Sequence, residues 1–315
     1  MEAISIRTAV VNGTTGAVGS ALTQHLLDLG VTVYAVIRPS SQRIENIPQG
    51  ARIVRCDLAE MEQLPERING QADAFFHLAW AHPIGPGRND MLAQTENIRC
   101  SIQAVRAAKA LGCQVFIGAG TQAEYGRIEG KVTADAPCFP TTGYGMAKLC
   151  AGQMTRMECQ RLGMRHVWAR ILSVYGPHDG PMSVIPMMMD KLLKGEKPAL
   201  TKGEQLWDYL YSADAADALW RMALNGQDGA VYPVGSGTVR PLKEYFMMLR
   251  DAIDPALPLG LGELPYGPGQ VMRLQADISD LQRDTGFAPS IPFEDGIRET
   301  LRQYQAEQTR KEARK

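Results

Sequence analysis

Long apolar runs and an excess of charge of either sign are both missing from this chain. No apolar stretch in its 315 residues reaches the length of a membrane span, and Met1–Arg7 has no signal-peptide pattern. The formal net charge is −1, so the protein has no overall field that would attract nucleic acid or an anionic membrane. We therefore expect a cytoplasmic protein that binds neither nucleic acid nor a membrane.

Disulfide and metal-site spacings are missing as well. The six cysteines are scattered and form no C-x-x-C pair. The five histidines also lack metal-ligand spacing, although His77 and His82 are close enough along the chain to share a site. We interpret the cysteines as reduced thiols that mostly pack in the interior, and we expect no bound metal.

Glycines are present where a nucleotide site needs them. An apolar run, 9–11, leads into a turn that carries Gly13, Gly16 and Gly19, and residues at helical spacing follow up to Gly30. Glycines let the backbone approach a pyrophosphate, whose charge is stabilised by the N-terminus of the following helix. The turn therefore predicts a dinucleotide site, whose candidate cofactor-binding residues are Gly13, Thr15, Gly16, Ala17, Val18 and Gly19.

The residue after the second predicted strand, 31–37, is Arg38. An acidic residue there would accept hydrogen bonds from the adenosine ribose, whereas a guanidinium suits a 2′-phosphate. The sequence thus favours NADP(H), with NAD(H) as the alternative. In the alternative interpretation, Arg38 stacks on the adenine or stays in solvent.

Strands and helices alternate along the first half of the chain. The predicted strands are 9–11, 31–37, 52–56, 73–78, 115–117 and 165–171, and the long helices are 89–111 and 144–163. This alternation predicts an α/β fold, a Rossmann-type doubly wound parallel sheet with helices on both faces. We expect this domain over 1–176. Residues 177–315 are expected to form a smaller, discontinuous substrate lobe, with about 205–235 returning to the core.

Several residues at the ends of these strands are further candidates for the cofactor site. Asp57 could accept from an adenine amino group or cap the next turn, and Leu58 follows it. Leu78 and Ala79 follow the fourth strand, where small residues would let the loop lie against a cofactor. Asn97, in the first long helix, either bonds locally or holds a water near the reaction centre.

Tyr144 and Lys148 are four residues apart, which places them on one face of the predicted helix. An ammonium stabilises a nearby phenolate, so Lys148 could make Tyr144 a usable acid–base group, as would the charge of an oxidised nicotinamide. Thr121 follows the fifth strand, at the sheet edge where ligands of such folds bind. Its hydroxyl could hydrogen-bond the reacting oxygen or merely cap a turn.

Together these motifs resemble the extended short-chain dehydrogenase/reductases, and within them the NAD-dependent epimerase/dehydratase family that modifies nucleotide sugars. The matching segments extend over nearly the whole chain: Gly13-x-x-Gly16-x-x-Gly19, Asp57–Leu58, His77–Leu78–Ala79, Asn97, Thr121 four before Tyr125–Gly126, Tyr144-x-x-x-Lys148, Tyr175–Gly176–Pro177 and Asp208–Tyr209-x-Tyr211-x-x-Asp214.

This resemblance implies roles for the candidate residues. Tyr144 would be the acid–base group, Lys148 would lower its pKa and hold the nicotinamide ribose, Thr121 would bind the substrate oxygen, and Asn97 would support a water relay. The helices 89–111 and 144–163 would form the faces of a homodimer. Our candidates for binding the substrate, expected to be a nucleotide sugar, are Trp80, Gln122, Tyr175, Trp207, Tyr211 and Arg273.

Departures from the family pattern narrow the choice of reaction. The family's 4,6-dehydratases have a Thr-Asp-Glu pattern before the Tyr–Gly pair, whereas here Thr121 is followed by Gln122 and Ala123. The missing acid and base disfavour a dehydratase, and Arg38 favours a reductase over an epimerase, so we expect an NADPH-dependent 4-keto-deoxysugar reductase. The alternatives are an NAD-dependent 4-epimerase and a non-catalytic NADP(H) sensor. Trp207 stands where the family often has an arginine that binds the diphosphate, and Lys202, Arg240 or Arg273 could compensate.

Overall fold

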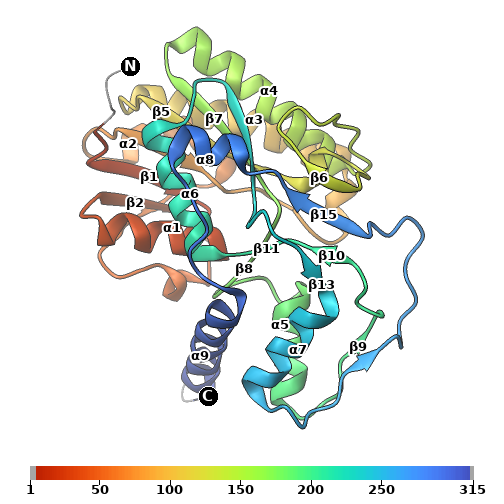
Figure 1. Ribbon diagram of the computed structural model, residues 1–315. Coiled ribbons are helices and arrows are strands. Elements are labelled where there is room, and N and C mark those ends of the chain that lie inside the picture. Colours follow the sequence, from red (N-terminus) through yellow and green to blue (C-terminus); the bar gives the residue numbers. More distant parts are fainter. Residues whose placement is uncertain (1–4, 313–315) are drawn as a thin grey trace.

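A seven-stranded parallel sheet forms the centre of the computed structural model, which describes residues 5–312. The strand order is β3-β2-β1-β4-β5-β7-β12, and Figure 1 shows the sheet between two layers of helices. The predicted Rossmann-type fold is thus confirmed. Its strands are β1 (Thr8–Asn12), β2 (Thr32–Ile37), β3 (Arg52–Arg55), β4 (Ala74–His77), β5 (Val115–Thr121), β7 (Arg165–Ile171) and β12 (Ala230–Val234).

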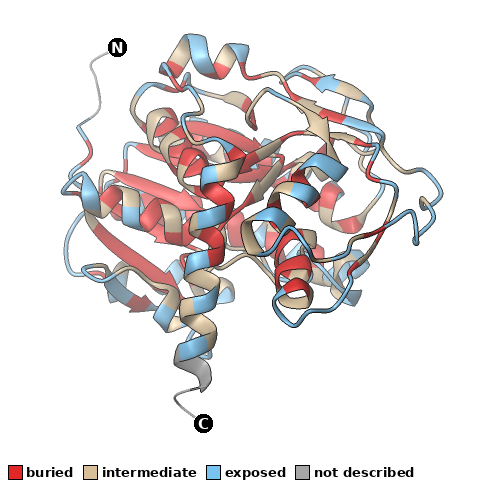
Figure 2. Ribbon diagram, turned by 60° about the horizontal axis from the view of Figure 1, so that its bottom comes forward, coloured by how far each residue is buried: buried red, intermediate tan, exposed pale blue. Residues whose placement is uncertain are grey.

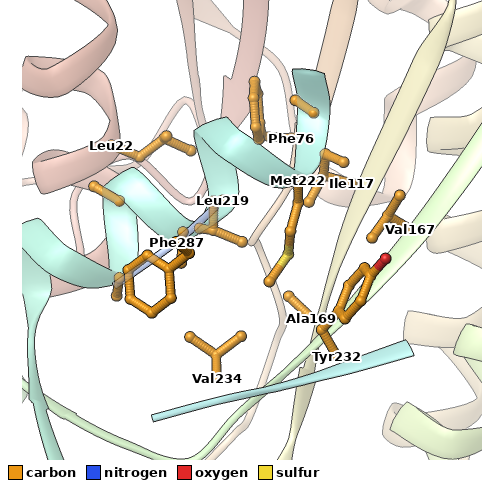
Figure 3. Close-up of a cluster of buried hydrophobic side chains, with 14 of the residues drawn as sticks. Leu22, Phe76, Ile117, Val167, Ala169, Leu219, Met222, Tyr232, Val234 and Phe287 are labelled. Atoms are coloured by element: carbon orange, nitrogen blue, oxygen red, sulfur yellow. The ribbon is translucent and has the colours of Figure 1, made fainter. Parts of the chain in front are cut away.

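Each face of the sheet is covered by its own set of helices. On one face, Leu22 of α1 and Leu219 and Met222 of α6 belong to one buried cluster (Figure 3), and on the other face Val105 of α3 and Phe116 belong to a second. Figure 2 shows the strands buried and the outer helix faces exposed. The helices of these layers are α1 (Ala17–Asp28), α2 (Leu64–Arg67), α3 (Met91–Ala110), α4 (Gly143–Leu162), α6 (Ser212–Asn225) and α8 (Ser279–Thr285).

The fifth strand is longer than the predicted 115–117. Gly118 and Gly120 look like loop residues in the sequence, yet both lie in β5. Glycine is needed at both positions because the Trp168 side chain of the neighbouring β7 leaves no room for a Cβ. Thr121 is therefore the last residue of the strand and not a loop residue beyond it.

The remaining elements form smaller units beside the sheet. A second sheet has the order β13-β10-β15-β6, and β11 pairs with β8 and β14 with β9. In Figure 1, α5, α7 and β9 lie together, away from α3 and α4. The bounds are β6 (Gly130–Val132), β8 (Ser173–Tyr175), α5 (Val184–Leu193), β9 (Ala199–Leu200), β10 (Leu206–Trp207), β11 (Tyr209–Tyr211), β13 (Arg240–Pro241), α7 (Leu242–Ile253), β14 (Gly260–Leu261), β15 (Arg273–Ala276) and α9 (Phe293–Glu312).

Two segments from the second half of the chain return to the main sheet. Helix α6 packs against α1, and β12 pairs in parallel with β7, from Ala230↔Val167 to Val234↔Ile171. The division of the chain at residue 176 stays a prediction. None of the helices between residues 5 and 312 is both long and apolar enough to cross a membrane.

Candidate functional site

The glycine turn lies between β1 and α1, where the strand order of the sheet reverses. Gly13 has a φ of +75°, and a Cβ there would lie 2.8 Å from the backbone nitrogen of Ala79. A Cβ on Gly19 would overlap the carbonyl oxygen of Gly13. At Gly16 the nearest atom would be 3.8 Å away. Gly13 and Gly19 therefore allow tight backbone packing, while the surface beside Gly16 stays open.

The open side of this turn fits a phosphate group. Gly16 precedes α1 and provides no side-chain cap, so the first N–H groups of the helix have no partner within the helix and are available to an anion. Arg43 and Asn46 donate hydrogen bonds to the carbonyl oxygen of Thr15, at 2.5 and 3.1 Å. Both donors come from the segment after β2, and they stabilise the turn from outside.

Asn12 joins the glycine turn to the loop after β4. Its Oδ1 accepts hydrogen bonds from the backbone N–H groups of Leu78 and Ala79, each at 2.8 Å, and its Nδ2 lies 2.8 Å from Nδ1 of His77. Burial lowers the pKa of His77 to about 3, so this ring is a neutral structural link. The sequence analysis did not single out Asn12, although a polar residue at the end of a buried strand was a usable signal.

Arg38 is exposed directly after β2, and its guanidinium makes no hydrogen bond or ion pair with the part of the chain that the structure describes. Asp57 caps the 3-10 helix η2 (Leu58–Gln63) by accepting from the N–H of Ala59 at 3.1 Å. This is the capping alternative, and Oδ2 of Asp57 has no hydrogen bond from the part of the chain that the structure describes. Leu58 packs against the core cluster on the α3 face.

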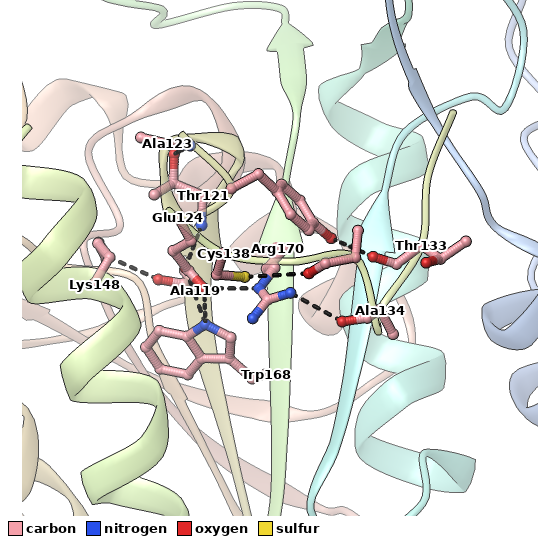
Figure 4. Close-up of polar contacts among 12 residues, drawn as sticks. Ala119, Thr121, Ala123, Glu124, Thr133, Ala134, Cys138, Lys148, Trp168 and Arg170 are labelled. Atoms are coloured by element: carbon pink, nitrogen blue, oxygen red, sulfur yellow. Dashed lines mark hydrogen bonds and ion pairs between the residues drawn. The ribbon is translucent and has the colours of Figure 1, made fainter. Parts of the chain in front are cut away.

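Thr121, Tyr144 and Lys148 meet at the carboxyl end of β5. Tyr144 is the second residue of α4 and Lys148 lies one turn further on, as the spacing predicted. The Nζ of Lys148 donates to the carbonyl oxygen of Ala119 at 2.7 Å and lies 4.0 Å from the centre of the Trp80 ring (Figure 4 shows the first contact). The structure thus brings the predicted trio together.

The pKa of Tyr144 differs from the expectation. Burial raises the pKa of Tyr144, and this effect exceeds the opposing effects of a hydrogen bond with Thr121 and of the charge on Arg88. Burial also lowers the pKa of Lys148 to about 7. The predicted lowering of the Tyr144 pKa by Lys148 is therefore not found, since this ammonium lies 6.0 Å from the phenol ring centre and is itself desolvated.

Glu124 holds the position of Thr121 (Figure 4). One oxygen of the Glu124 carboxylate accepts from the backbone N–H of Thr121 at 2.8 Å, and the other accepts from Nε of Arg170 at 2.8 Å. Trp168 donates to both oxygens, at 3.1 and 3.2 Å. Because Glu124 is fully buried and its oxygens are occupied, the carboxylate stabilises the end of β5.

Asn97 and Gln94 hold the loop after β4. Asn97 exchanges two hydrogen bonds with the backbone of Ala81, donating at 3.0 Å and accepting at 2.9 Å. The Oε1 of Gln94 accepts from the indole nitrogen of Trp80 at 2.9 Å. Asn97 also donates to the carbonyl oxygen of Ala93, one turn earlier in α3, at 3.2 Å. Its part in a water relay stays a prediction. The sequence analysis missed Gln94, because its partners lie in another segment.

A cavity of about 500 Å³ lies among α5, β8, β9 and β10, and Thr121, Tyr144 and Lys148 are not among its lining residues. Tyr175 and Trp207 line it, together with Asp179, and none of the described lining residues is Lys, Arg or His. The indole nitrogen of Trp207 donates to Oγ of Ser173 at 2.7 Å, and this hydroxyl lies 3.5 Å from Oε1 of Gln122. Three of the predicted substrate residues thus lie at or beside the cavity.

The other predicted substrate residues lie elsewhere. Trp80 packs edge-on to the ring of Tyr144, with 6.1 Å between ring centres. Tyr211 is buried against Tyr175 and does not line the cavity. Arg273 is exposed on β15, outside the cavity, and donates to Gln275 at 3.0 Å. A substrate-binding role for Tyr211 or Arg273 therefore gains no support from this geometry.

Comparisons with known proteins extend over the same elements. The model of the NAD dependent epimerase/dehydratase family matches residues 9–235. The dTDP-glucose 4,6-dehydratase of Neisseria meningitidis serogroup B is 26% identical over 335 aligned positions, which cover 95% of this chain and 93% of the relative. A UDP-N-acetylglucosamine 4-epimerase from Methanobrevibacter ruminantium, solved with UDP-N-acetylmuramic acid, superposes with a TM-score of 0.85 at 24% identity, covering 96% and 99% of the two chains. A Thermus thermophilus UDP-glucose 4-epimerase solved with NAD gives 0.82 at 23%, covering 95% and 99%.

The reversed strand order, the glycine turn and the Tyr144–Lys148 pair define an extended short-chain dehydrogenase/reductase. Because the family model covers well over half of its length, the chain belongs to the NAD dependent epimerase/dehydratase family.

Proposed function

We propose that this protein is an NADP(H)-dependent oxidoreductase that reduces a 4-keto-deoxysugar nucleotide. The named relatives act on dTDP- and UDP-linked sugars, and this supports the substrate class. The observation that carries the cofactor preference is the unpaired, exposed guanidinium of Arg38 after β2, at the place where an acidic residue would accept from the ribose hydroxyls.

In this proposal the residues of the trio divide the work. Bound NADPH supplies the hydride. Thr121 donates a hydrogen bond to the substrate ketone, and Tyr144 gives it a proton as the carbonyl becomes an alcohol. Lys148 would hold the nicotinamide ribose, and its ammonium, when protonated, would stabilise the phenolate that Tyr144 becomes until the phenolate regains a proton from solvent. The glycine turn and the N–H groups at the start of α1 would hold the pyrophosphate.

The surroundings of Thr121 support reduction over dehydration. Elimination of water needs an acid and a base beside the substrate. Gln122 and Ala123 supply neither, and the carboxylate of Glu124 is buried in its ion pair with Arg170. For the diphosphate, we propose Lys202, which is exposed and adjacent to the cavity residue Thr201. Arg240 is paired with Glu294 at 2.9 Å and is a weaker candidate.

The test is to mix the enzyme and NADPH with 4-keto-6-deoxyhexoses linked to dTDP, CDP, GDP or UDP. We expect stoichiometric consumption of NADPH with one of them, and loss of this activity in Tyr144→Phe. No consumption with any of the four would overturn the proposal. Arg38→Asp should lower the preference for NADPH over NADH by about ten- to a hundredfold, since a charge-assisted hydrogen bond contributes about 1.5–3 kcal/mol.

An NAD-dependent 4-epimerase is the second candidate, because several similar folds are nucleotide-sugar 4-epimerases. The cofactor released when the purified protein is denatured separates the two candidates. Tightly held NAD would favour the epimerase, and an empty or NADP(H)-containing site would favour the reductase. A non-catalytic sensor would keep its function in Tyr144→Phe.

We also propose a homodimer that forms through α3 and α4. These two helices expose four large methionines that a second copy would cover: Met91, Met146, Met154 and Met157. Sedimentation analysis of the wild type and of Met154→Glu tests this. A variant that sediments as the monomer would support the interface, and a wild-type monomer would exclude it.

A further inference from the structure

Arg88 lies against the face of the Tyr144 ring. It belongs to the short 3-10 helix η3 (Pro86–Asn89), in the loop between β4 and α3. The carbon of its guanidinium is 4.4 Å from the centre of the phenol ring, well inside the range of a cation–π contact. Its Nη1 donates to the carbonyl oxygen of Pro83, which fixes the side chain within its own loop.

The loop that carries Arg88 is bound to the first turn of α4. The Oδ1 of Asn89 accepts from the backbone N–H of Gly143 at 3.0 Å. A Cβ on Gly143 would lie 2.9 Å from the Met91 side chain and 3.2 Å from the carbonyl oxygen of Arg88. Glycine at this position therefore permits close packing, which keeps Arg88 and Tyr144 at a fixed distance.

Lys148 is less well placed than Arg88 to act on the phenol ring. Its Nζ lies 6.0 Å from the ring centre, and its hydrogen bond goes to Ala119. Burial lowers the pKa of Lys148 to about 7, because the buried site disfavours the charged ammonium. A guanidinium stays protonated at every physiological pH. Arg88 is thus the permanent cation beside the phenol.

The other groups around Tyr144 do not replace this charge. Thr121 on β5 offers a neutral hydroxyl, and Trp80 presents a ring edge. Glu124 in the 3-10 helix η4 (Gln122–Glu124) is negative and disfavours a phenolate. Among the described residues that act on this phenol, Arg88 and Lys148 are the cations.

We propose that Arg88 is a positioning residue for Tyr144, whose fixed positive charge orients the phenol and favours its ionised form. The catalytic consequence rests on the function proposed above, whereas the effect on phenol ionisation does not. In turnover, the phenol must lose a proton to the substrate oxygen and regain one from solvent. A permanent cation on the face of the ring stabilises the phenolate that exists between these two steps.

The test measures ionisation at position 144 without a substrate. Difluorotyrosine, whose phenol ionises nearer to neutral pH than that of tyrosine, is incorporated at position 144 alone, and its absorbance is followed against pH. We expect Arg88→Met to raise the midpoint by about one pH unit, the lower end of the effect of an opposite charge at this range. Arg88→Lys should keep most of the wild-type midpoint. The matched control is Arg99→Met on α3, whose guanidinium is paired with Glu96, and it should leave the midpoint unchanged.

An unchanged midpoint in Arg88→Met would overturn the proposal, as would an equal shift in Arg88→Lys. A purely structural role would lower the melting temperature of both variants without moving the midpoint. If the reductase assay succeeds, the pH profile of kcat/KM in Arg88→Met should shift in the same direction, with the KM for NADPH retained. If that assay fails while the midpoint shifts, the proposed reaction is wrong and the role of Arg88 stands.

Discussion

Replacing Arg170 by Met tests how the end of β5 is held. The guanidinium of Arg170 pairs with the Glu124 carboxylate at 2.8 Å, and the two side chains are 5% and 0% exposed. Removing the cation leaves the buried carboxylate of Glu124 without its counter-charge. The typical loss of unfolding free energy for such a change is about 3–5 kcal/mol. We place the loss near 3 kcal/mol, because Trp168 and the N–H of Thr121 still donate to Glu124.

This loss converts into a measurable shift. With about 2.1 cal/mol/K of unfolding entropy per residue, 315 residues give about 0.66 kcal/mol/K, so the melting temperature should fall by about 5 °C. Calorimetry and urea titration measure the two quantities. The double variant Glu124→Gln/Arg170→Met should recover at least half of the loss.

A surface pair provides the control for this experiment. Arg298 pairs with Asp295 at 2.8 Å, but both side chains are more than half exposed, at 68% and 61%. Arg298→Met should therefore change the unfolding free energy by at most about 1 kcal/mol. If Arg170→Met were no more destabilising than Arg298→Met, our interpretation of Glu124 as the structural support of Thr121 would be wrong.

Three further predictions concern the cofactor turn and the trio. Tyr144→Phe should lower kcat/KM by about a hundredfold or more while calorimetric cofactor affinity is retained, and an unchanged rate would contradict its acid–base role. Gly19→Ala should lower the yield of folded protein, because its Cβ would overlap the Gly13 carbonyl oxygen. Gly16→Ala should fold normally but bind the dinucleotide weakly. Thermal melts with and without NADP measure both effects. Burial lowers the pKa of Lys148 from 10.5 to about 7, so the unfolded chain binds more protons between these values and this residue's contribution to stability rises with pH across the interval. Urea titrations should show that Lys148→Met removes this slope, and an equal slope in both proteins would contradict the assignment.

Local spacing was enough to predict the parts of the site that lie within one element. The turn with Gly13, Gly16 and Gly19 and the Tyr144–Lys148 pair follow from the geometry of a single strand–turn–helix or of one helical turn. The alternation of strands and helices was likewise enough for the sheet. The return of about 205–235 to the core stays a prediction, and within that range β12 pairs with β7.

Contacts between distant segments could not be predicted in the same way. Arg170 and Glu124 are 46 residues apart, and nothing in either neighbourhood marks them as partners. The contact of Arg88 with Tyr144 depends on how the loop after β4 folds back onto α4. The pKa of Tyr144 is set by burial, which spacing alone does not reveal. Local periodicity therefore located the candidate reacting groups but not the side chains that surround them.

The pairing of β12 with β7 has a consequence for how such an enzyme can be taken apart. Strand β12 lies at one edge of the large sheet and is formed by residues that come later in the sequence than most of the residues that line the cavity. A fragment that stops after Tyr175 would leave the whole edge of β7 unpaired and open to aggregation. The large sheet is thus incomplete without β12, and replacing the cavity wall requires two junctions, one after β8 and one before α6, so that this strand is kept.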